Sequence, residues 1–277
     1  MRINANFEQL FSTLEANRSQ GIGFVPTMGF LHQGHLSLIE ASRKQNLYTV
    51  VSIFVNPAQF GANEDLDVYP SNPEGDYQLS MQAGADLVWY PSVDNIYPAS
   101  AQTSVLPGAL ANKLCGVSRP QFFPGICTVV LKLFNIIRPS HTFFGEKDFQ
   151  QLTIIRRMVR DFFLPIEVVG CPTVREPDGL AMSSRNANLA PQDRGLALTL
   201  YRQIVAAKDA FAAGQNNAEA LRATLRANWP EGIDLDYLDF RNPSSLEEET
   251  TLTPQSRIFL GAWLNGVRLI DNAALGA

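Results

Sequence analysis

Apolar residues in the first 175 positions gather in short runs that alternate with amphipathic segments. The run 21–26 ends in a turn signal, and the run 47–55 is continuous and rich in β-branched and aromatic residues. Such runs are typical of strands that are covered on both faces of a parallel sheet. Between them, the apolar spacing that begins at Leu36 indicates a helix. The order strand, helix, strand predicts a βαβ unit at the start of the chain.

The same alternation continues along this region. Further helices are predicted over 73–85, 129–137 and 147–163. Further strands are predicted over 86–90, 142–144 and 166–169. Strands that alternate with helices in this way predict an α/β fold with a doubly wound parallel sheet, in which ligands bind at the carboxyl ends of the strands.

The pattern changes after Arg175, where a polar and turn-rich stretch leads into an alanine-rich helical segment. Helices are predicted over 192–213 and 218–228, and strands over 233–240, 257–264 and 267–270. We therefore predict two domains. Residues 1–176 form the sheet domain that binds nucleotide and substrate, and residues 177–277 form a smaller C-terminal α+β domain.

Composition narrows the class of protein. The 277 residues are 45% hydrophobic and 18% charged, and no run approaches the roughly 18 apolar residues that a membrane span needs. The first residues lack the features of a secretory signal, so we expect a soluble cytoplasmic protein with no membrane partner. Cys115, Cys127 and Cys171 are scattered and match neither a disulfide framework nor a zinc motif, which predicts three buried thiols.

The net charge of −5 predicts that the chain does not bind nucleic acid, because its overall field does not attract a polyanion. Any phosphate must therefore be held by a local cationic pocket. Neither the P-loop motif nor the dinucleotide fingerprint occurs in the sequence.

Two of the three histidines stand where the first predicted strand meets the first helix. The segment reads Thr27-Met28-Gly29-Phe30-Leu31-His32-Gln33-Gly34-His35. Residues three apart at a helix start share a face, beside backbone N–H groups that favour an anion. His32 and His35 can thus stabilise a phosphorus centre, and one can protonate a departing pyrophosphate. The alternative is that one of the two histidines is a helix cap and the other is a hydrogen-bonded residue of the core.

A second cluster follows the strand at 142–144 and includes Gly145, Glu146, Lys147, Asp148 and Gln151. The lysine can meet a phosphate, the aspartate can accept from ribose hydroxyls, and the glutamine can bind a small polar substrate. Glu146 to Asp148 can equally be an acidic first turn that suits a helix dipole.

Two further segments carry candidate ligand contacts. Met182-Ser183-Ser184-Arg185, on the polar stretch, can clamp a triphosphate tail, although this composition is common in loops. Gln59 follows the second strand and can serve a hydroxyl and a carboxylate. Asp65, Asp67 and Asp76, further along, can hold Mg²⁺ between phosphate oxygens or can be turn formers.

Five linked motifs together closely resemble the pantothenate synthetase (pantoate-β-alanine ligase) family. They are Pro26-Thr27-Met28-Gly29, His32-x-Gly34-His35, Phe54-Val55-Asn56-Pro57, Phe144-Gly145-Glu146-Lys147-Asp148 and Ser183-Ser184-Arg185-Asn186. The resemblance runs almost end to end and is thinnest in the C-terminal domain. It implies the nucleotidyltransferase superfamily with the His-x-Gly-His signature, a Rossmann-like domain with a smaller C-terminal lid, and a homodimer.

The resemblance also implies a reaction. ATP and pantoate give pantoyl adenylate and pyrophosphate, and β-alanine then displaces AMP to give pantothenate, a precursor of coenzyme A. A different adenylyl- or cytidylyl-transferase of the same superfamily is the alternative.

By the same resemblance, each candidate residue takes a role. His35 is the general acid, with His32 beside it on the phosphates, and Lys147 and Arg185 complete the catalytic group. The residues implied to line the ATP site are Met28, Gly29, Phe30, Leu31, His32, Gln33, Gly34, His35, Gly145, Glu146, Lys147, Asp148, Val174, Met182, Ser183, Ser184 and Arg185. Gln59 and Gln151 are implied to bind pantoate, and Asp76 to contact Mg²⁺.

The chain departs from the family pattern in two places. The family often has His-Phe and then a basic residue where this chain has Phe122, Phe123 and Pro124. An arginine is common where Ser71 stands. The surroundings of Arg119 are therefore less well defined by the resemblance.

Overall fold

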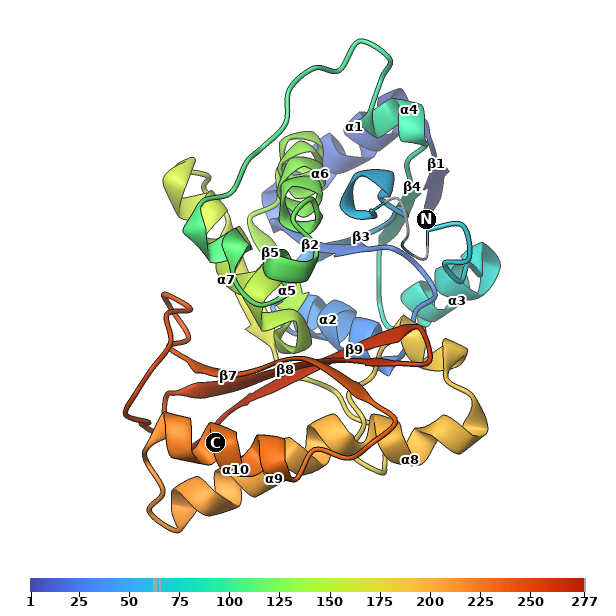
Figure 1. Cartoon of the computed structure of the whole chain (residues 1–277). Helices are drawn as coiled ribbons and strands as arrows, with labels where there is room; N and C mark the ends of the chain where they lie inside the picture. The colour runs from blue at the N-terminus through green and yellow to red at the C-terminus, as the bar shows by residue number, and fades with distance from the viewer. Residues whose placement is uncertain (62–63, 65, 277) are drawn as a thin grey trace.

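The computed structural model describes residues 1–61, 64 and 66–276, and its larger layer is a parallel β-sheet (Figure 1). The described strands of this sheet are β1 (Arg2–Asn4), β2 (Ile22–Thr27), β3 (Tyr48–Ile53), β4 (Leu87–Tyr90), β5 (His141–Gly145) and β6 (Glu167–Cys171). They pair in the order β1-β4-β3-β2-β5-β6, and every pair is parallel. The predicted doubly wound α/β sheet is confirmed.

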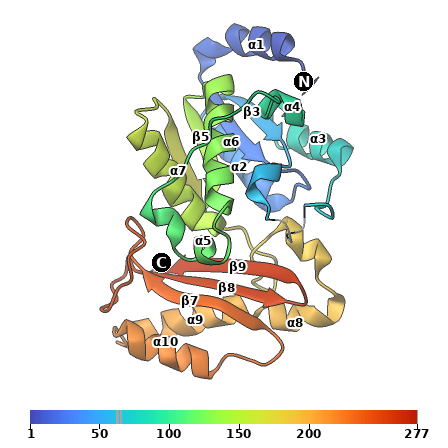
Figure 2. The ribbon, with the colours of Figure 1, turned by 45° about the horizontal axis from the view of Figure 1, so that its top comes forward.

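Helices cover both faces of the sheet (Figures 1 and 2). They are α1 (Phe7–Ala16), α2 (Gln33–Lys44), α3 (Pro73–Gln82), α4 (Val93–Ile96), α5 (Cys115–Ser118), α6 (Phe122–Ile137) and α7 (Phe149–Asp161). One core packs α1, α6 and α7 against strand residues such as Phe24 and Val50. A second core packs α2 and α3 against Val25 and Val51, the next residue on each strand. Side chains alternate between the faces of a strand, so each face has its own core.

The strand order reverses beside β2, which lies between β3 and β5. The chain passes from β2 through α2 to β3 on one side, and β5 is added later on the other side. Ligands in open α/β sheets bind in the crevice at such a reversal, outside the carboxyl ends of the strands. The segments that leave β2 and β5, residues 28–32 and 146–148, therefore start side by side.

The rest of the chain forms an antiparallel sheet with helices on one face. Its strands are β7 (Asp234–Arg241), β8 (Arg257–Leu264) and β9 (Val267–Ala274), and its helices are α8 (Arg194–Ala197), α9 (Thr199–Ala212) and α10 (Ala218–Ala227). A separate apolar core joins α9 and α10 to this sheet. The sheet lies between these two helices and the larger domain (Figure 2). The predicted boundary after residue 176 stays a prediction.

Several elements differ from the sequence predictions. β1, α1, α4 and α5 were not predicted, and α6 begins at Phe122 rather than at residue 129. Pro124 lies in the first turn of α6, where proline costs no hydrogen bond. Gly125 is needed there because a Cβ atom would lie 2.3 Å from the carbonyl oxygen of Ala58. The final strand, β9, runs to Ala274 instead of ending at residue 270.

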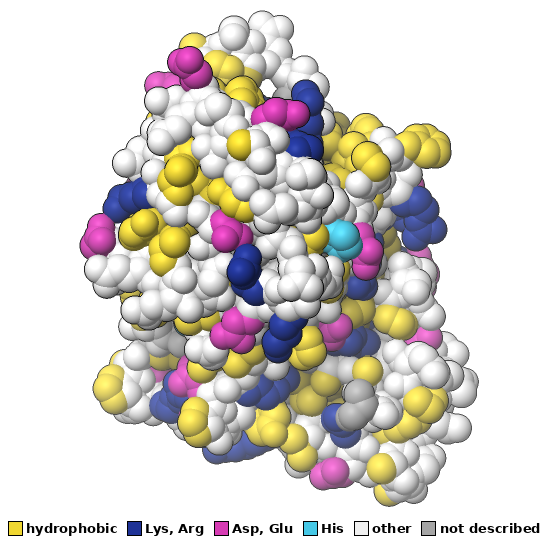
Figure 3. All heavy atoms as spheres, turned by 180° about the vertical axis from the view of Figure 1, so that it is seen from behind, with side chains coloured by type: hydrophobic (Ala, Val, Ile, Leu, Met, Phe, Trp, Pro, Cys, Tyr) yellow, Lys and Arg dark blue, Asp and Glu magenta, His cyan; other side chains and the backbone are white. Residues whose placement is uncertain are grey.

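Two predictions from composition have structural outcomes. Cys115, Cys127 and Cys171 are all buried and free, as predicted. Over the described residues, no helix has both the length and the apolar character needed to cross a membrane. On the face seen from behind, Lys and Arg side chains are interspersed with Asp and Glu (Figure 3).

Candidate active site

The loop that leaves β2 is anchored by a carboxylate from α3. Gly29 and Phe30 both have left-handed backbone conformations, with φ of 90° and 52°. Asp76 is 2% exposed, and its Oδ2 and Oδ1 accept from the backbone N–H of Phe30 and Leu31 at 2.8 and 2.7 Å. A Cβ atom on Gly29 would lie 3.0 Å from Asp76 Oδ2. Glycine is therefore favoured here both by φ and by the approach of the carboxylate.

The two imidazoles form the start of α2. His32 is the N-cap, and its Nδ1 accepts from Gly34 N at 3.1 Å. His35 Nδ1 accepts from His32 N at 3.3 Å, and the ring centroids are 4.1 Å apart. A neutral imidazole whose Nδ1 accepts a hydrogen bond carries its proton on Nε2. Both rings thus keep an N–H donor for a ligand, so capping and ligand binding are compatible roles for these residues.

The structure keeps both rings neutral. Burial is the main cause that lowers the pKa of His35 to about 3, and the neighbouring His32 and Lys147 lower it further. Burial followed by Lys147 lowers the pKa of His32 to about 4, against opposing contributions from Asp148 and Glu176. Near pH 7 both imidazoles are therefore neutral.

This pKa lowering predicts that the protein becomes less stable in mild acid. An unfolded histidine titrates near pH 6.5. Between that pH and about 4, the unfolded chain binds more protons than the folded chain, so stability is full above pH 6.5 and falls as the pH falls. We expect the Tm at pH 5 to lie a few degrees below that at pH 7, and the decrease to be smaller in His35→Gln than in His141→Gln. Equal decreases in the two variants would contradict the assignment.

Lys147 stands at the end of the neighbouring strand. β5 leads into a 3-10 turn, Glu146–Asp148, and then directly into α7. The ammonium Nζ of Lys147 lies 3.7 Å from Asp148 Oδ2, and the lysine side chain is 19% exposed. Its charge acts on both imidazoles. The lysine and the two histidines therefore face one crevice, from two adjacent strand ends.

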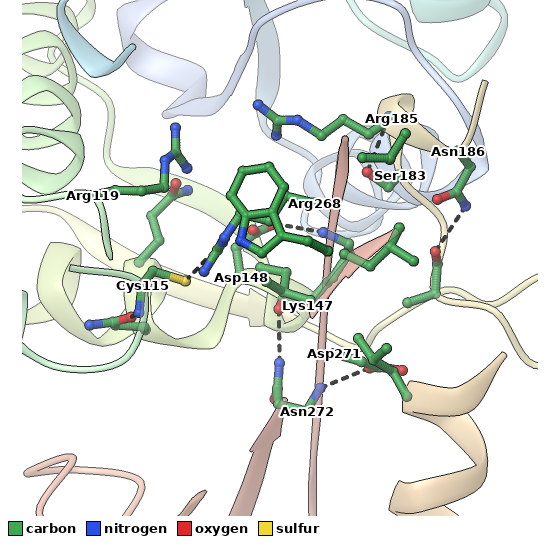
Figure 4. A pocket seen from close by; sticks show the side chains of 18 of the residues that line it. Cys115, Arg119, Lys147, Asp148, Ser183, Arg185, Asn186, Arg268, Asp271 and Asn272 are labelled. Atoms are coloured by element: carbon green, nitrogen blue, oxygen red, sulfur yellow. Dashed lines mark hydrogen bonds and ion pairs between the residues drawn. The ribbon is translucent and has the colours of Figure 1, made fainter. Parts of the chain in front are cut away.

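The polar stretch after β6 folds back over the loop that follows β2. Ser184 Oγ donates to the carbonyl oxygen of Phe30 at 3.2 Å, and Ser183 Oγ accepts from Arg185 N at 3.3 Å. The guanidinium of Arg185 lies 5.9 Å from the ring centroid of Tyr69. Ser183 and Arg185 border the same cavity as Lys147 and Asp148 (Figure 4).

Most of the predicted site residues line one cavity of about 230 Å³ at the reversal of the strand order. They are Met28, His32, Gly34, His35, Gln59, Gly145, Lys147, Asp148, Gln151, Val174, Met182, Ser183, Ser184 and Arg185. A larger cavity of about 470 Å³ lies between the small antiparallel sheet and the segment from Lys147 to Gln151, and it shares Lys147, Asp148 and Arg185 with the smaller cavity. The two cavities are parts of one cleft between the domains.

The other predicted site residues do not line the smaller cavity. They are Gly29, Phe30, Leu31, Gln33, Glu146 and Asp76. Gln33 is exposed, and the Glu146 carboxylate lies 3.4 Å from Arg257 of β8. Asp76 is anchored to the backbone as described above, and Asp65 lies outside the described residues.

The two glutamines predicted to bind substrate lie in the smaller cavity. Gln59 is 8% exposed, and its Oε1 accepts from Asn56 Nδ2 at 3.0 Å. Gln151 borders both cavities. Gln150 borders the larger cavity but not the smaller one, and its side chain accepts from Cys115 N and donates to carbonyl groups near α5. Asn56 also lines the cavity and was missed by the sequence analysis.

Arg119, whose surroundings the resemblance left open, is firmly held. Its guanidinium forms an ion pair with Glu64 and donates to the carbonyl oxygen of Gln59 at 3.3 Å. The Phe122 ring centroid lies 3.6 Å from the guanidinium carbon, and Phe122 borders both cavities. The phenylalanine at this position thus covers one face of the arginine.

Sequence comparisons place the chain among known enzymes. The family model described as pantoate-beta-alanine ligase matches residues 2–274. A pantothenate synthetase from Thermotoga petrophila is 43% identical over 280 residues, covering 100% of both chains. Another, from Pelobacter propionicus, is 46% identical and covers 100% of this chain and 99% of its own.

Structure comparisons agree. The pantothenate synthetase of Thermus thermophilus has 43% identity and a TM-score of 0.93, covering 100% of both chains. The pantoate-beta-alanine ligase of Francisella tularensis, complexed with beta-gamma ATP and beta-alanine, has 37% identity and a TM-score of 0.81, covering 100% of this chain and 99% of its own. The fold, the cleft and these matches define an enzyme of the ligase class. The chain belongs to the pantoate-β-alanine ligase family, whose members join pantoate to β-alanine to form pantothenate.

Proposed function

We propose that the chain activates pantoate with ATP and carries the adenylate to β-alanine within the cleft. In the first step a pantoate carboxylate oxygen forms a bond to the α-phosphorus of ATP, and the bond from that phosphorus to the pyrophosphate oxygen breaks. In the second step the amine of β-alanine forms a C–N bond to the acyl carbon, and AMP leaves. The complex of the Francisella tularensis relative with an ATP ligand and β-alanine supports this assignment of substrates.

The convergence of His32, His35 and Lys147 on one cavity is the observation that carries the proposal. Pantoate and the triphosphate are both anions, and they repel each other unless donors and cations offset their charge. Two Nε2–H donors, an ammonium group and the start of α2 supply that compensation at the carboxyl end of β2. These groups are fixed by the fold before a ligand arrives, which is what electrostatic stabilisation of a transition state requires.

His35 has two possible contributions at the leaving pyrophosphate. As a neutral donor it can hydrogen-bond to the developing charge, and a bound triphosphate would raise its pKa towards that of a general acid. We propose that His32 contacts the phosphates beside it. Lys147, Ser183, Ser184 and Arg185 hold the phosphate tail, and Met28 to His35 supply the surrounding backbone.

The remaining cavity residues fit the other parts of the two substrates. Asp148 and Gly145 lie at the carboxyl end of β5 for the ribose, and Val174 and Met182 form the adenine side. Gln59 and Gln151 offer amides for the hydroxyl and carboxylate of pantoate. The apolar wall beside them suits its methyl groups, and consists of Phe54, Phe122, Ile126, Val129 and Val130.

The fold family implies Mg²⁺, but Asp76 does not fit the role of its ligand. Both oxygens of this buried carboxylate are taken by backbone N–H groups. Among the residues that the structure describes, no group of three or more His, Cys, Asp or Glu side chains could hold an ion. Mg²⁺ commonly binds through substrate phosphates and water. We therefore propose that it enters with ATP and assign no side chain to it.

Asp76 instead has the geometry of a loop anchor. In Asp76→Asn, an amide NH₂ replaces one acceptor, so one backbone N–H of the loop loses its partner, which typically costs about 1–3 kcal/mol. We expect adenylate formation to fall by about 10-fold or more, with the Mg²⁺ concentration that gives half-maximal rate unchanged. Titrating the rate with Mg²⁺ at saturating ATP checks this. A large rise in the Mg²⁺ requirement would restore the metal role.

Three further properties rest on other grounds: the dimer on the family resemblance, and the location and the lack of other partners on composition and charge. We propose that the chain is a homodimer, that it works in the cytoplasm, and that it has no nucleic-acid or membrane partner. Analytical ultracentrifugation at micromolar concentration tests the dimer.

A sequential assay tests the function. Protein, ATP and Mg²⁺ are mixed with pantoate, and β-alanine is added later while pyrophosphate and AMP are followed separately. We expect pyrophosphate, but no AMP, to be released when pantoate is present, and AMP to be released after β-alanine is added. Pyrophosphate release that does not depend on pantoate would instead favour another adenylyl- or cytidylyl-transferase.

A further inference from the structure

One side chain of the C-terminal domain forms hydrogen bonds with the turn that carries Lys147. Asn272 of β9 is 4% exposed, and its Nδ2 donates to the carbonyl oxygens of Glu146 and Lys147 at 3.0 and 2.8 Å. Figure 4 shows Asn272 beside Lys147, joined to it by one of these bonds. Both bonds cross from the small antiparallel sheet to the end of β5. The turn that holds the lysine is therefore fastened by the other domain.

Asn272 is itself fixed on both sides. Its Oδ1 accepts from Arg257 of β8, whose guanidinium carbon lies 3.8 Å from the Phe149 ring centroid. Its backbone N–H donates to Asp271 Oδ1 at 2.8 Å. With Oδ1 bonded to an arginine, the amide has only one orientation in which Nδ2 faces the two carbonyl groups. The donor is thus pre-oriented towards the lysine turn.

The adjacent residue ties β9 to a second segment of the site. Asp271 is 3% exposed, and its two oxygens accept from Arg175 at 2.6 and 2.9 Å. Arg175 belongs to the segment in which Met182 N bonds to Val174 O at 3.0 Å. Two successive residues of β9 thus hold two different walls of the cleft, the Lys147 turn and the segment that leads to Ser183.

We infer that Asn272 is a positioning residue for Lys147, so that adenylate formation requires the C-terminal domain to be docked. The inference rests on the proposed role of Lys147 in that step. Asn272 borders the larger cavity but not the smaller one that holds the two histidines. Its effect on the chemistry runs through the backbone of residues 146 and 147, and a misplacement of about 1 Å at a reacting group can cost about 100-fold in rate.

The C-terminal domain then has two roles. It covers the cleft and excludes water, as a lid does. It also completes the active site, because a chain with the domain undocked leaves the lysine turn without the two bonds from Asn272. Pyrophosphate release should therefore depend on the C-terminal domain even before β-alanine is present.

A double-mutant cycle on the full chain tests the inference. Pantoate-dependent pyrophosphate release is measured without β-alanine for the wild type, Asn272→Ala, Lys147→Ala and the double variant. We expect Asn272→Ala alone to lose about 10- to 100-fold. In the Lys147→Ala background the same change should cost less than about 3-fold, since residues that act through one another are not additive. Losses that simply multiply would overturn the inference.

Matched variants distinguish a local effect on the Lys147 turn from a general loss of folding. Asn272→Asp keeps the size and the acceptor for Arg257 but turns an oxygen towards two carbonyl groups, so its rate should fall at least as far as that of Asn272→Ala. Asn217→Asp makes the same change of charge at the N-cap of α10, where the side chain accepts from Ala220 N and aspartate caps equally well. It should stay within about 2-fold of wild type. A Tm for Asn272→Ala close to wild type with an unchanged rate would also refute the role.

The two failures are distinguishable. If Lys147→Ala retains a normal rate, the proposed function of the lysine fails. If that variant is slow but Asn272→Ala is normal or fully additive with it, only the role of Asn272 fails.

Discussion

Replacing Lys147 with alanine is expected to lower the rate of adenylate formation by about 100-fold or more. The charge of the ammonium group lowers the pKa of both His32 and His35, so this group acts on the same part of the cavity as the two neutral imidazoles. Removing one preorganised donor from a charged transition state typically costs about 3–4 kcal/mol. The rate of pyrophosphate release in single turnover with pantoate measures the loss directly.

Lys44→Ala is the matched control for this prediction. Lys44 is exposed in the last turn of α2, at the opposite end of the helix from His32 and His35. Lys44→Ala removes the same charge at a position that lines neither cavity, so the rate should be unchanged. A Lys147→Ala enzyme that turns over nearly as fast as Lys44→Ala would remove the lysine from the mechanism.

The second large effect is expected for His35→Ala, again about 100-fold or more in adenylate formation. The ring supplies an Nε2–H donor inside the cavity, and its Nδ1 also accepts from His32 N. The substitution therefore removes one donor from the cavity and loosens the capping arrangement that orients the other imidazole. Pre-steady-state release of pyrophosphate, compared with ATP affinity, separates the chemical loss from a binding loss.

His141→Ala is the control histidine. His141 begins β5 at the amino end of the strand, where it pairs with Ser140 and with Glu167 at 3.2 Å. It belongs to the same sheet but lies away from the carboxyl ends that carry the site. Its removal should leave adenylate formation within a few fold of wild type, and a loss as large as that of His35→Ala would show that the effect is not local.

The sequence was informative wherever a strand end and its following turn carry the chemistry together. His32 and His35 sit on one helix start, so their spacing alone predicted that they share a face, and the cavity contains both. Lys147 follows the next strand of the sheet, and the alternation of strands and helices predicted that such ends meet. Gln151, which the sequence placed one turn into the following helix, borders both cavities.

Contacts between distant segments could not be predicted in the same way. Asp76 could have been a metal ligand or a turn former, and only its distances to Phe30 N and Leu31 N reveal an anchor. Asn272 lies past the predicted end of its strand, and its partners precede it by 125 residues or more. No local pattern encodes such a contact, because it depends on how two sheets pack against each other.

Short elements were also beyond the sequence pattern. β1 has three residues and pairs with β4 at the edge of the sheet. Three residues are too few for an alternation of apolar and polar positions to be recognised. The start of α6 was hidden by Pro124 and Gly125, since both residues usually mark turns. Their place in the first turn of the helix is decided by the close approach of Ala58.

We propose that the crevice between β2 and β5 brings the α-phosphorus of ATP to the two imidazoles and Lys147. The decisive measurement is a crystal structure with pantoate and an ATP analogue that cannot be cleaved at the α-phosphate. We expect His35 Nε2 within hydrogen-bond distance of the bridging or pyrophosphate oxygens, with Lys147 Nζ on the same phosphates. A nucleotide bound with its phosphates away from both residues would contradict it.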